Sequence, residues 1–108
     1  MSENPTGDLD DLLQHRVRLG ACVLLADAEA LSFSRLKEFL EETDGNLGSH
    51  LAKLEIAGYV TIKKEFQDRK PVTWYRLSKR GRDALSAHLE ALEVLIRRAK
   101  ASHKRSAE

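Results

Sequence analysis

The chain has 108 residues, of which 42% are hydrophobic and 32% are charged, and its formal net charge at pH 7 is +1. This balance predicts one globular domain with a modest core, and the absence of a run of about 18 apolar residues argues against a membrane span. The start of the chain has neither a basic end nor an apolar stretch, so we expect no secretory signal. Cys22 is the only cysteine, which excludes an internal disulfide and favours a cytoplasmic location.

Charge is divided unevenly along the chain. Residues 1–44 carry ten acidic and four basic side chains, a net charge of −6, whereas residues 45–108 carry seven acidic and fourteen basic ones, a net charge of +7. Blocks of this size are often only solvated surface. Because the basic half also holds the binding patterns described below, its positive potential favours a polyanionic partner.

The first part of the chain predicts an arm and a helix. We expect a disordered arm over residues 1–8, with Asp8 as N-cap of a helix over about residues 9–28. The apolar residues at helical spacing are Leu9, Leu13, Val17, Ala21, Leu24 and Leu25. Leu12 and Leu19 lie off that stripe, so a second surface must cover them, and a partner chain is one candidate.

Two short helices are expected next. Residues 31–33 favour a small strand or turn, and Ser34 is the expected N-cap of a helix that ends near residue 42. Its inward residues are expected to be Leu36, Phe39 and Leu40. Turn chemistry at residues 43–45 separates this helix from another over about residues 46–57.

A β-hairpin follows. Gly58 suits the left-handed residue that ends a helix. Residues 59–66 alternate between apolar and polar side chains, and residues 72–77 are rich in β-branched and aromatic ones, which is typical of paired strands. We expect residues 67–71 to form the loop between them.

The last helix predicts a dimer. Ser78 is its expected N-cap, and it should run to about Ala99, before a flexible basic tail over residues 100–108. Its apolar seam repeats at steps of four and three: Leu85, Leu89, Leu92, Ile96 and Ala99. A helix of about 20 residues spans roughly 30 Å, more than so small a domain covers alone. We expect a homodimer with the interface residues Leu9, Leu12, Leu13, Leu85, Leu89, Leu92 and Ile96; the alternative is that the seam docks only onto its own domain.

The order of elements predicts the fold class. Helix, short strand, two helices, hairpin and long helix make an α+β plan that is mostly α. Two helices joined by a tight turn and followed by a two-stranded wing form a winged helix-turn-helix. We therefore assign residues 9–99 to a single winged-helix DNA-binding domain that includes a long C-terminal dimerisation helix.

The third helix has an apolar and a polar face. The apolar stripe is Leu47, Leu51 and Leu54. The opposite face gathers, within roughly 100°, the hydrogen-bonding residues Asn46, Ser49, His50 and Lys53. Amide, hydroxyl and ammonium groups bond to base edges and phosphates, so we expect these four residues to contact DNA. The alternatives are an ordinary solvent face and, for His50 alone, a pH-sensing or metal-binding role.

The hairpin is rich in basic side chains. They are Lys63, Lys64, Arg69, Lys70 and Arg76. A basic finger beside a recognition helix can lie along the phosphates or place an arginine in the minor groove, and Arg69 and Lys70 are the expected tip contacts. The alternative is that lysines only prevent strand-to-strand aggregation. Trp74 and Tyr75 lie on opposite faces, so at least one should pack on the core; a stacking platform for single-stranded nucleic acid is the weaker interpretation.

Residue patterns for catalysis are missing. The sequence contains no glycine-rich phosphate loop, no zinc-protease motif and no clustered cysteines, and its histidines are scattered. We expect no enzyme, no cofactor and no metal. Cys22 should be a small buried apolar residue, with a thiol redox switch as the alternative.

Three segments, at residues 16–25, 44–60 and 74–85, resemble the small winged-helix transcriptional regulators of the MarR/ArsR-like group. The most specific runs are His-Leu-x-x-Leu-x-x-Ala-Gly-Tyr-Val and Tyr-Arg-Leu-Ser-x-x-Gly. The resemblance implies a helix in the major groove, a wing on the DNA backbone and terminal helices that form a dimer. The cysteine pair of ArsR-type metal sensors is absent, and the chain is shorter than typical MarR members, which argues against their effector pocket.

Together these patterns predict a sequence-specific transcriptional regulator that binds double-stranded DNA as a cytoplasmic homodimer, most simply as a repressor, without membrane contact. Two alternatives remain open. One is a winged-helix protein-interaction module whose basic wing faces an acidic partner. The other is a sensor whose effector site forms across the dimer, and no residue pattern identifies that effector.

Overall fold

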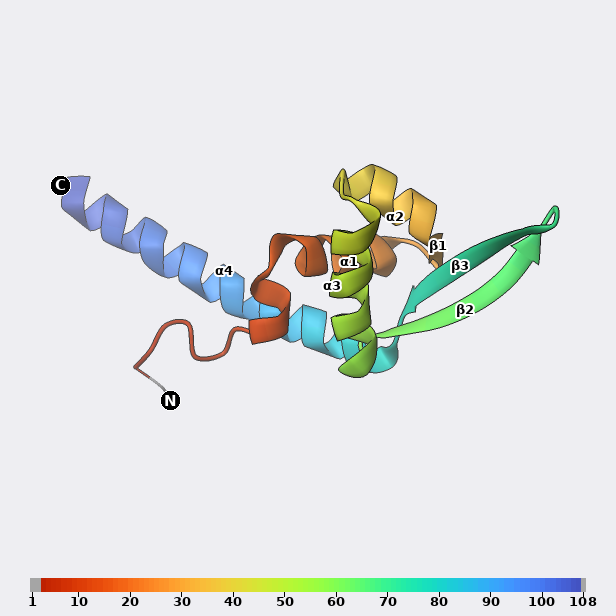
Figure 1. The fold of residues 1–108 in the computed structure, drawn as a ribbon. Coiled ribbons are helices and arrows are strands. Elements are labelled where there is room, and N and C mark those ends of the chain that lie inside the picture. Colours follow the sequence, from red (N-terminus) through yellow and green to blue (C-terminus); the bar gives the residue numbers. More distant parts are fainter. Residues whose placement is uncertain (1–2, 108) are drawn as a thin grey trace.

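The computed structural model describes residues 3–107, and Figure 1 shows a helical body from which a hairpin and a long helix project on opposite sides. Within these residues the elements are η1 (Asp11–Gln14), α1 (Arg16–Asp27), β1 (Leu31–Ser32), α2 (Phe33–Leu40), α3 (Asp44–Ile56), β2 (Val60–Gln67), β3 (Lys70–Leu77) and α4 (Lys79–Ala107). This order confirms the α+β, mostly helical winged-helix fold with a long C-terminal helix. Residues 1, 2 and 108 of the expected arm and tail lie outside the described range, and residues 5–8 form turns.

Leucines dominate the core. The buried apolar side chains come from η1, every α-helix and both long strands: Leu13, Val17, Ala21, Cys22, Leu25, Leu36, Leu47, Leu51, Leu54, Val60, Tyr75, Leu77 and Leu85. Full burial of such a side chain stabilises the fold by about 1.5–3 kcal/mol. The predicted stripe of α3 is fully inside. Phe39 of α2, expected to face inward, is instead half-exposed, with the guanidinium of Arg35 4.7 Å from its ring centre.

The first helix is broken, and the prediction of one continuous helix capped by Asp8 is wrong. Asp10 caps the 3₁₀ turn η1, and His15 caps α1; each side chain accepts a hydrogen bond from the backbone N–H two residues on, at 2.9 and 3.2 Å. Local bonds of this kind compete with helix continuation. The Asp10 N–H also donates to Nδ1 of His88 on α4 at 3.0 Å, which fixes the break against the body.

The boundaries of α2 and α3 also differ from expectation. Ser32, and not Ser34, caps α2, and Glu41 ends it in the left-handed region with φ 52°. Thr43 caps α3 through its hydroxyl, so residues 44–45, expected in a turn, begin the helix. The connection between the two helices, residues 41–43, therefore has the expected length but begins two residues earlier than the turn residues suggested.

Two predicted caps are confirmed and lie together. Gly58 has φ 80°, a conformation that other residues rarely adopt, and it leads from α3 into β2. The Ser78 hydroxyl accepts from the N–H of Gly81 at 3.0 Å and donates to the Gly58 carbonyl at 2.6 Å. A Cβ on Gly81 would lie only 2.2 Å from the Tyr59 carbonyl oxygen, so glycine allows α4 to start against the root of the wing.

The wing is a tight hairpin. The antiparallel sheet has the order β1-β3-β2, and β2 pairs with β3 from Val60↔Leu77 to Gln67↔Lys70. Only two residues, Asp68 and Arg69, form the turn, both with positive φ, as in a type I′ hairpin. The expected loop over residues 67–71 is wrong, because pairing continues to the turn. Pro71 is tolerated in β3 because β1 does not reach that far along the sheet.

The long helix α4 extends further than the seam predicted. It continues to Ala107, beyond the expected end at about Ala99. Its first half packs on the body through Leu85 and His88, which are both buried. The second half projects from the body (Figure 1), and the molecule is 64 Å along its longest axis.

Candidate nucleic-acid interface

Helix α3 presents three of its four predicted contact residues to solvent. Asn46, Ser49 and Lys53 are exposed, while the leucine stripe holds the opposite side of the helix in the core. The Asn46 amide donates to a carboxylate oxygen of Glu42 at 2.5 Å, so this acidic side chain must release it before it reaches a base. A Cβ on Gly48 would meet nothing within 4 Å, which leaves the surface open between Asn46 and Ser49.

His50 is the exception, and its predicted place on the outer face is wrong. It is only 8% exposed, and its ring centre lies 4.0 Å from that of His15. Nη1 of Arg18 lies 2.9 Å from His50 Nδ1. Because arginine only donates, Nδ1 must accept, and the ring is neutral with its proton on Nε2. The helix position one step beyond the leucine stripe faces α1, which the simple division into two faces did not resolve.

The surroundings of His50 keep it neutral. Burial lowers its pKa below the ordinary value of 6.5, and the charges of His15, Arg18 and Lys53 lower it further, while Glu42 acts in the opposite direction. His50 therefore adds no positive charge to the interface at pH 7. Arg18 also donates from Nε to the Leu12 carbonyl at 2.6 Å, so it ties α3 to the connector before α1.

The five basic residues of the wing divide into two groups. Lys63 pairs with Glu65 at 3.1 Å, and Arg76, at the root of the wing, pairs with Glu29 at 3.2 Å. Among the ion pairs within residues 3–107, none includes the exposed side chains of Lys64, Arg69 and Lys70. Free cations thus gather at the tip. We call the exposed set the outward surface: Asn46, Ser49, Lys53, Lys64, Arg69 and Lys70.

The two aromatic residues of β3 face opposite sides, as predicted. Tyr75 is buried, with its ring centre 6.4 Å from that of Phe33. Trp74 lies on the other face, where it lines a hollow of about 200 Å³ with Ala30, Lys63, Glu65 and Arg76. Its Nε1 is the buried side-chain polar atom without a hydrogen-bond partner in the described part of the chain.

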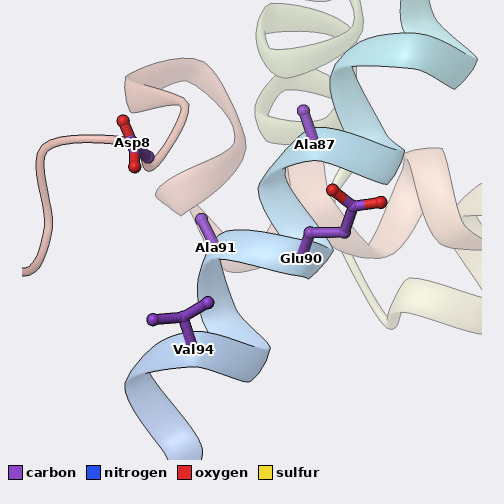
Figure 2. A pocket seen from close by; sticks show the side chains of 5 residues that line it. All are labelled: Asp8, Ala87, Glu90, Ala91 and Val94. Atoms are coloured by element: carbon purple, nitrogen blue, oxygen red, sulfur yellow. The ribbon is translucent and has the colours of Figure 1, made fainter. Parts of the chain in front are cut away.

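The predicted dimer residues fall into three groups. Leu13 and Leu85 are buried in the core of their own chain, so their expected place at an interface is wrong. Half-buried positions are Leu9, Leu12 and Leu92. Leu89 and Ile96 are exposed on α4, as is Val94, which the seam did not include. Val94 lines a hollow of about 430 Å³ together with Asp8, Ala87, Glu90 and Ala91. Figure 2 shows these five side chains, four of them on α4 and Asp8 on the segment that precedes η1.

Within the described residues, Cys22 and the other potential ligands show no arrangement for redox or metal chemistry. Burial, together with the charge of Asp10, raises the pKa of the Cys22 thiol to about 12, so the reactive thiolate is scarce. Across residues 3–107, no group of three or more His, Cys, Asp or Glu side chains is placed to hold a metal ion. The same residues contain no helix long and apolar enough to cross a membrane.

Comparison with known proteins adds to this geometry. A family model described as a winged helix DNA-binding domain matches residues 17–96. An uncharacterised protein of Methanocaldococcus jannaschii is 38% identical over 73 residues, which cover 68% of this chain and 79% of that protein.

Solved structures share the same architecture. A transcriptional regulator homologue from Pyrococcus horikoshii OT3 has 33% identity and a TM-score of 0.74, over 79% of this chain and 84% of that chain. A MarR family transcriptional regulator from Streptomyces coelicolor, solved in complex with DNA, has 23% identity and a TM-score of 0.64, over 95% of this chain and 72% of that chain. At 23% identity, the likeness to the Streptomyces coelicolor protein shows a shared fold.

Proposed function

The chain belongs to the winged helix DNA-binding domain family, and on this premise we propose that it is a sequence-specific transcriptional regulator that binds double-stranded DNA as a homodimer. One observation carries the proposal. Three leucines hold α3 on the body while Asn46, Ser49 and Lys53 remain exposed on its outer side. The relatives described as a transcriptional regulator homologue and as a regulator in complex with DNA support the same activity here.

In this proposal α3 enters the major groove. The Asn46 amide suits the paired donor and acceptor of an adenine edge, once it leaves Glu42. Ser49 reaches a base edge or a phosphate, and Lys53 a guanine or a phosphate. Buried and neutral, His50 orients the helix through Arg18 and contacts no DNA.

The wing supplies electrostatic contacts. Lys64, Arg69 and Lys70 carry charges that no acidic side chain in the described chain pairs at close range, so they are available for phosphates. Lys63 and Arg76 already form ion pairs with carboxylates, so they should contribute less to phosphate binding. The two-residue turn fixes where the Arg69 side chain leaves the hairpin.

Helix α4 is the proposed dimer element. Its 29 residues span about 43 Å, and its projecting half exposes Leu89, Val94 and Ile96. A second copy would cover these side chains and the hollow of Figure 2. Two-fold symmetry would then place two α3 helices on successive turns of a palindromic site, where the bound cytoplasmic dimer blocks transcription as a repressor.

Binding measured against salt concentration tests the proposal. The parent protein should lose affinity for duplex DNA steeply as salt rises, and Arg69→Ala should reduce the slope of log affinity on log salt by about one for each bound protomer, or about two for a dimer. Lys104→Ala, which removes an exposed charge at the far end of α4, is the matched control and should leave the slope unchanged. Sequence reading is tested by Asn46→Ala, which should cost about 1–3 kcal/mol at one base position.

The result against the proposal is equally clear. If the parent binds no duplex, or if its affinity ignores salt and neither Arg69→Ala nor Asn46→Ala changes it, the domain is an interaction module for a protein partner. Light scattering tests the dimer, and a monomer at micromolar concentration would remove the two half-sites.

A further inference from the structure

Phe66 is an exposed aromatic side chain close to the tip of the wing. Its side chain is 78% exposed, and a single strand residue, Gln67, separates it from the turn. Alternate residues of a strand lie on the same face, so Phe66 shares a face with Val60 and Ile62. The body lies beneath Val60 and Ile62 but does not extend beneath Phe66.

Burial fades along the hairpin for a geometric reason. Val60 is buried, Ile62 is half-buried opposite Tyr75, and Phe66 lies four residues further on, about 13 Å along the strand. The third strand, β1, pairs with β3 only at Tyr75 and Trp74. The outer part of the wing is therefore a bare two-stranded ribbon that projects from the body (Figure 1).

The cross-strand partner of Phe66 is Pro71, which is also exposed. On the same face the next pair toward the body is Lys64 and Thr73, and Arg69 stands in the turn beyond. An apolar pair is thus set between cations that have no ion-pair partner among the described residues. Solubility alone would favour polar side chains at such a tip.

This combination fits the DNA minor groove, which offers phosphates on both rims and apolar sugar and base edges between them. The groove is about 6 Å wide, whereas the two strands of the ribbon alone are about 4.8 Å apart, so entry requires it to open. Apolar side chains pressed between base steps open the groove and bend the duplex.

We propose that Phe66, backed by Pro71, is an apolar wedge that enters the minor groove and partly unstacks one base step, while Arg69 and Lys70 hold the flanking phosphates. This inference rests on the proposed function and adds a DNA-deforming residue to it. Sequence preference then arises at the wing as well as at α3, because pyrimidine–purine steps unstack most easily.

The test uses a duplex that the full chain selects from a random pool, with 2-aminopurine replacing adenines in turn next to each half-site. Unstacking raises the fluorescence of this base. Binding of the parent should raise it at one step per half-site and should bend the duplex in a gel-mobility assay. Phe66→Ala should lose both signals, and Phe66→Leu should keep most of the bend.

Two controls separate a local effect from general damage. Ile56→Ala removes an apolar side chain that is 86% exposed at the end of α3 and should preserve both signals. Thermal melting of Phe66→Ala should match the parent, because the ring packs on little of its own chain.

The failures are distinguishable. If the parent binds no duplex, the proposed function fails and the wedge with it. If the parent binds with a steep salt dependence but shows no fluorescence rise or bend, or if Phe66→Ala retains both, the wedge is overturned and the proposed function stands. Binding to anionic phospholipid vesicles is measured as well, because an exposed aromatic ring beside cations could also bind a membrane surface. If Phe66→Ala abolishes vesicle binding but leaves the fluorescence rise and the bend unchanged, the wedge is overturned.

Discussion

The helical body and the wing use similar side chains in opposite ways. In the body, Leu13 and Leu85 lie in the core, and His50 is held between His15 and Arg18. In the wing, Phe66 is exposed and its neighbouring cations have no ion-pair partner in residues 3–107. The difference shows that what lies across from a residue, and not its type, decides whether it stabilises the fold or is free to bind.

This contrast changes the expected interface. His50 leaves the set of contacts because α1 covers it, and Phe66 joins because nothing covers it. In the proposed function, polar residues of the body thus position α3, whereas the outward surface would carry the DNA contacts. Substitutions should therefore separate into those that change stability and those that change binding.

The largest expected difference in stability is between Leu54→Ala and Phe66→Ala. Leu54 is fully buried in α3, so its truncation should lower the free energy of unfolding by about 2–5 kcal/mol. Phe66→Ala removes an exposed ring and should change it by less than about 0.5 kcal/mol. Urea denaturation measures both. Similar losses for the two variants would mean that the wing packs on the body more closely than described.

Thiol reactivity gives the next contrast. With its pKa raised to about 12 by burial, Cys22 should hold roughly three orders of magnitude less thiolate at pH 8 than an ordinary cysteine. The folded parent should therefore react with a thiol reagent only as fast as it opens, whereas Lys64→Cys should add one thiol that reacts at once. Rapid labelling of the folded parent would show that Cys22 is accessible.

Two glycines offer a matched pair within the helices. Gly81→Ala would place a Cβ against the Tyr59 carbonyl and should destabilise by about 1–3 kcal/mol. Gly48→Ala adds a Cβ in open space inside α3 and should stabilise by up to about 1 kcal/mol. Thermal or urea unfolding of the two variants measures both changes in stability. A loss of stability in both variants would contradict the open surface between Asn46 and Ser49.

The smallest effect concerns pH. The folded state disfavours protonation of His50, whose unfolded pKa is near 6.5, so the unfolded chain takes up the proton first. The free energy of unfolding should therefore fall as pH drops below 6.5, and His50→Gln should make that fall shallower. His103→Gln, on the exposed end of α4, is the control. Identical pH profiles for the parent and His50→Gln would rule out this contribution.

The sequence predicted what local chemistry controls. Gly58 and Ser78 were assigned correctly because a left-handed residue and a helix cap have strong local preferences. The leucine stripe was correct because its spacing permits only one inward face. These features were enough for the order of elements and for the winged-helix class.

Tertiary contacts decided the rest. The break before α1 depends on His88, far along the chain, which accepts a hydrogen bond from Asp10. The burial of His50 depends on where α1 passes, and the exposure of Phe66 on where β1 stops. Alternation reports which face a strand residue shares, but not how far the body extends beneath that face.

Crosslinking from single positions tests the central claim most directly. A photoreactive group on Ser49→Cys should join α3 covalently to the selected duplex, while the same group on Ser102→Cys, at the exposed end of α4, should not. The buried Cys22 stays unlabelled in both proteins. Equal yields from the two positions, or adducts from Ser102→Cys alone, would contradict the assignment of α3 as the helix that reads DNA.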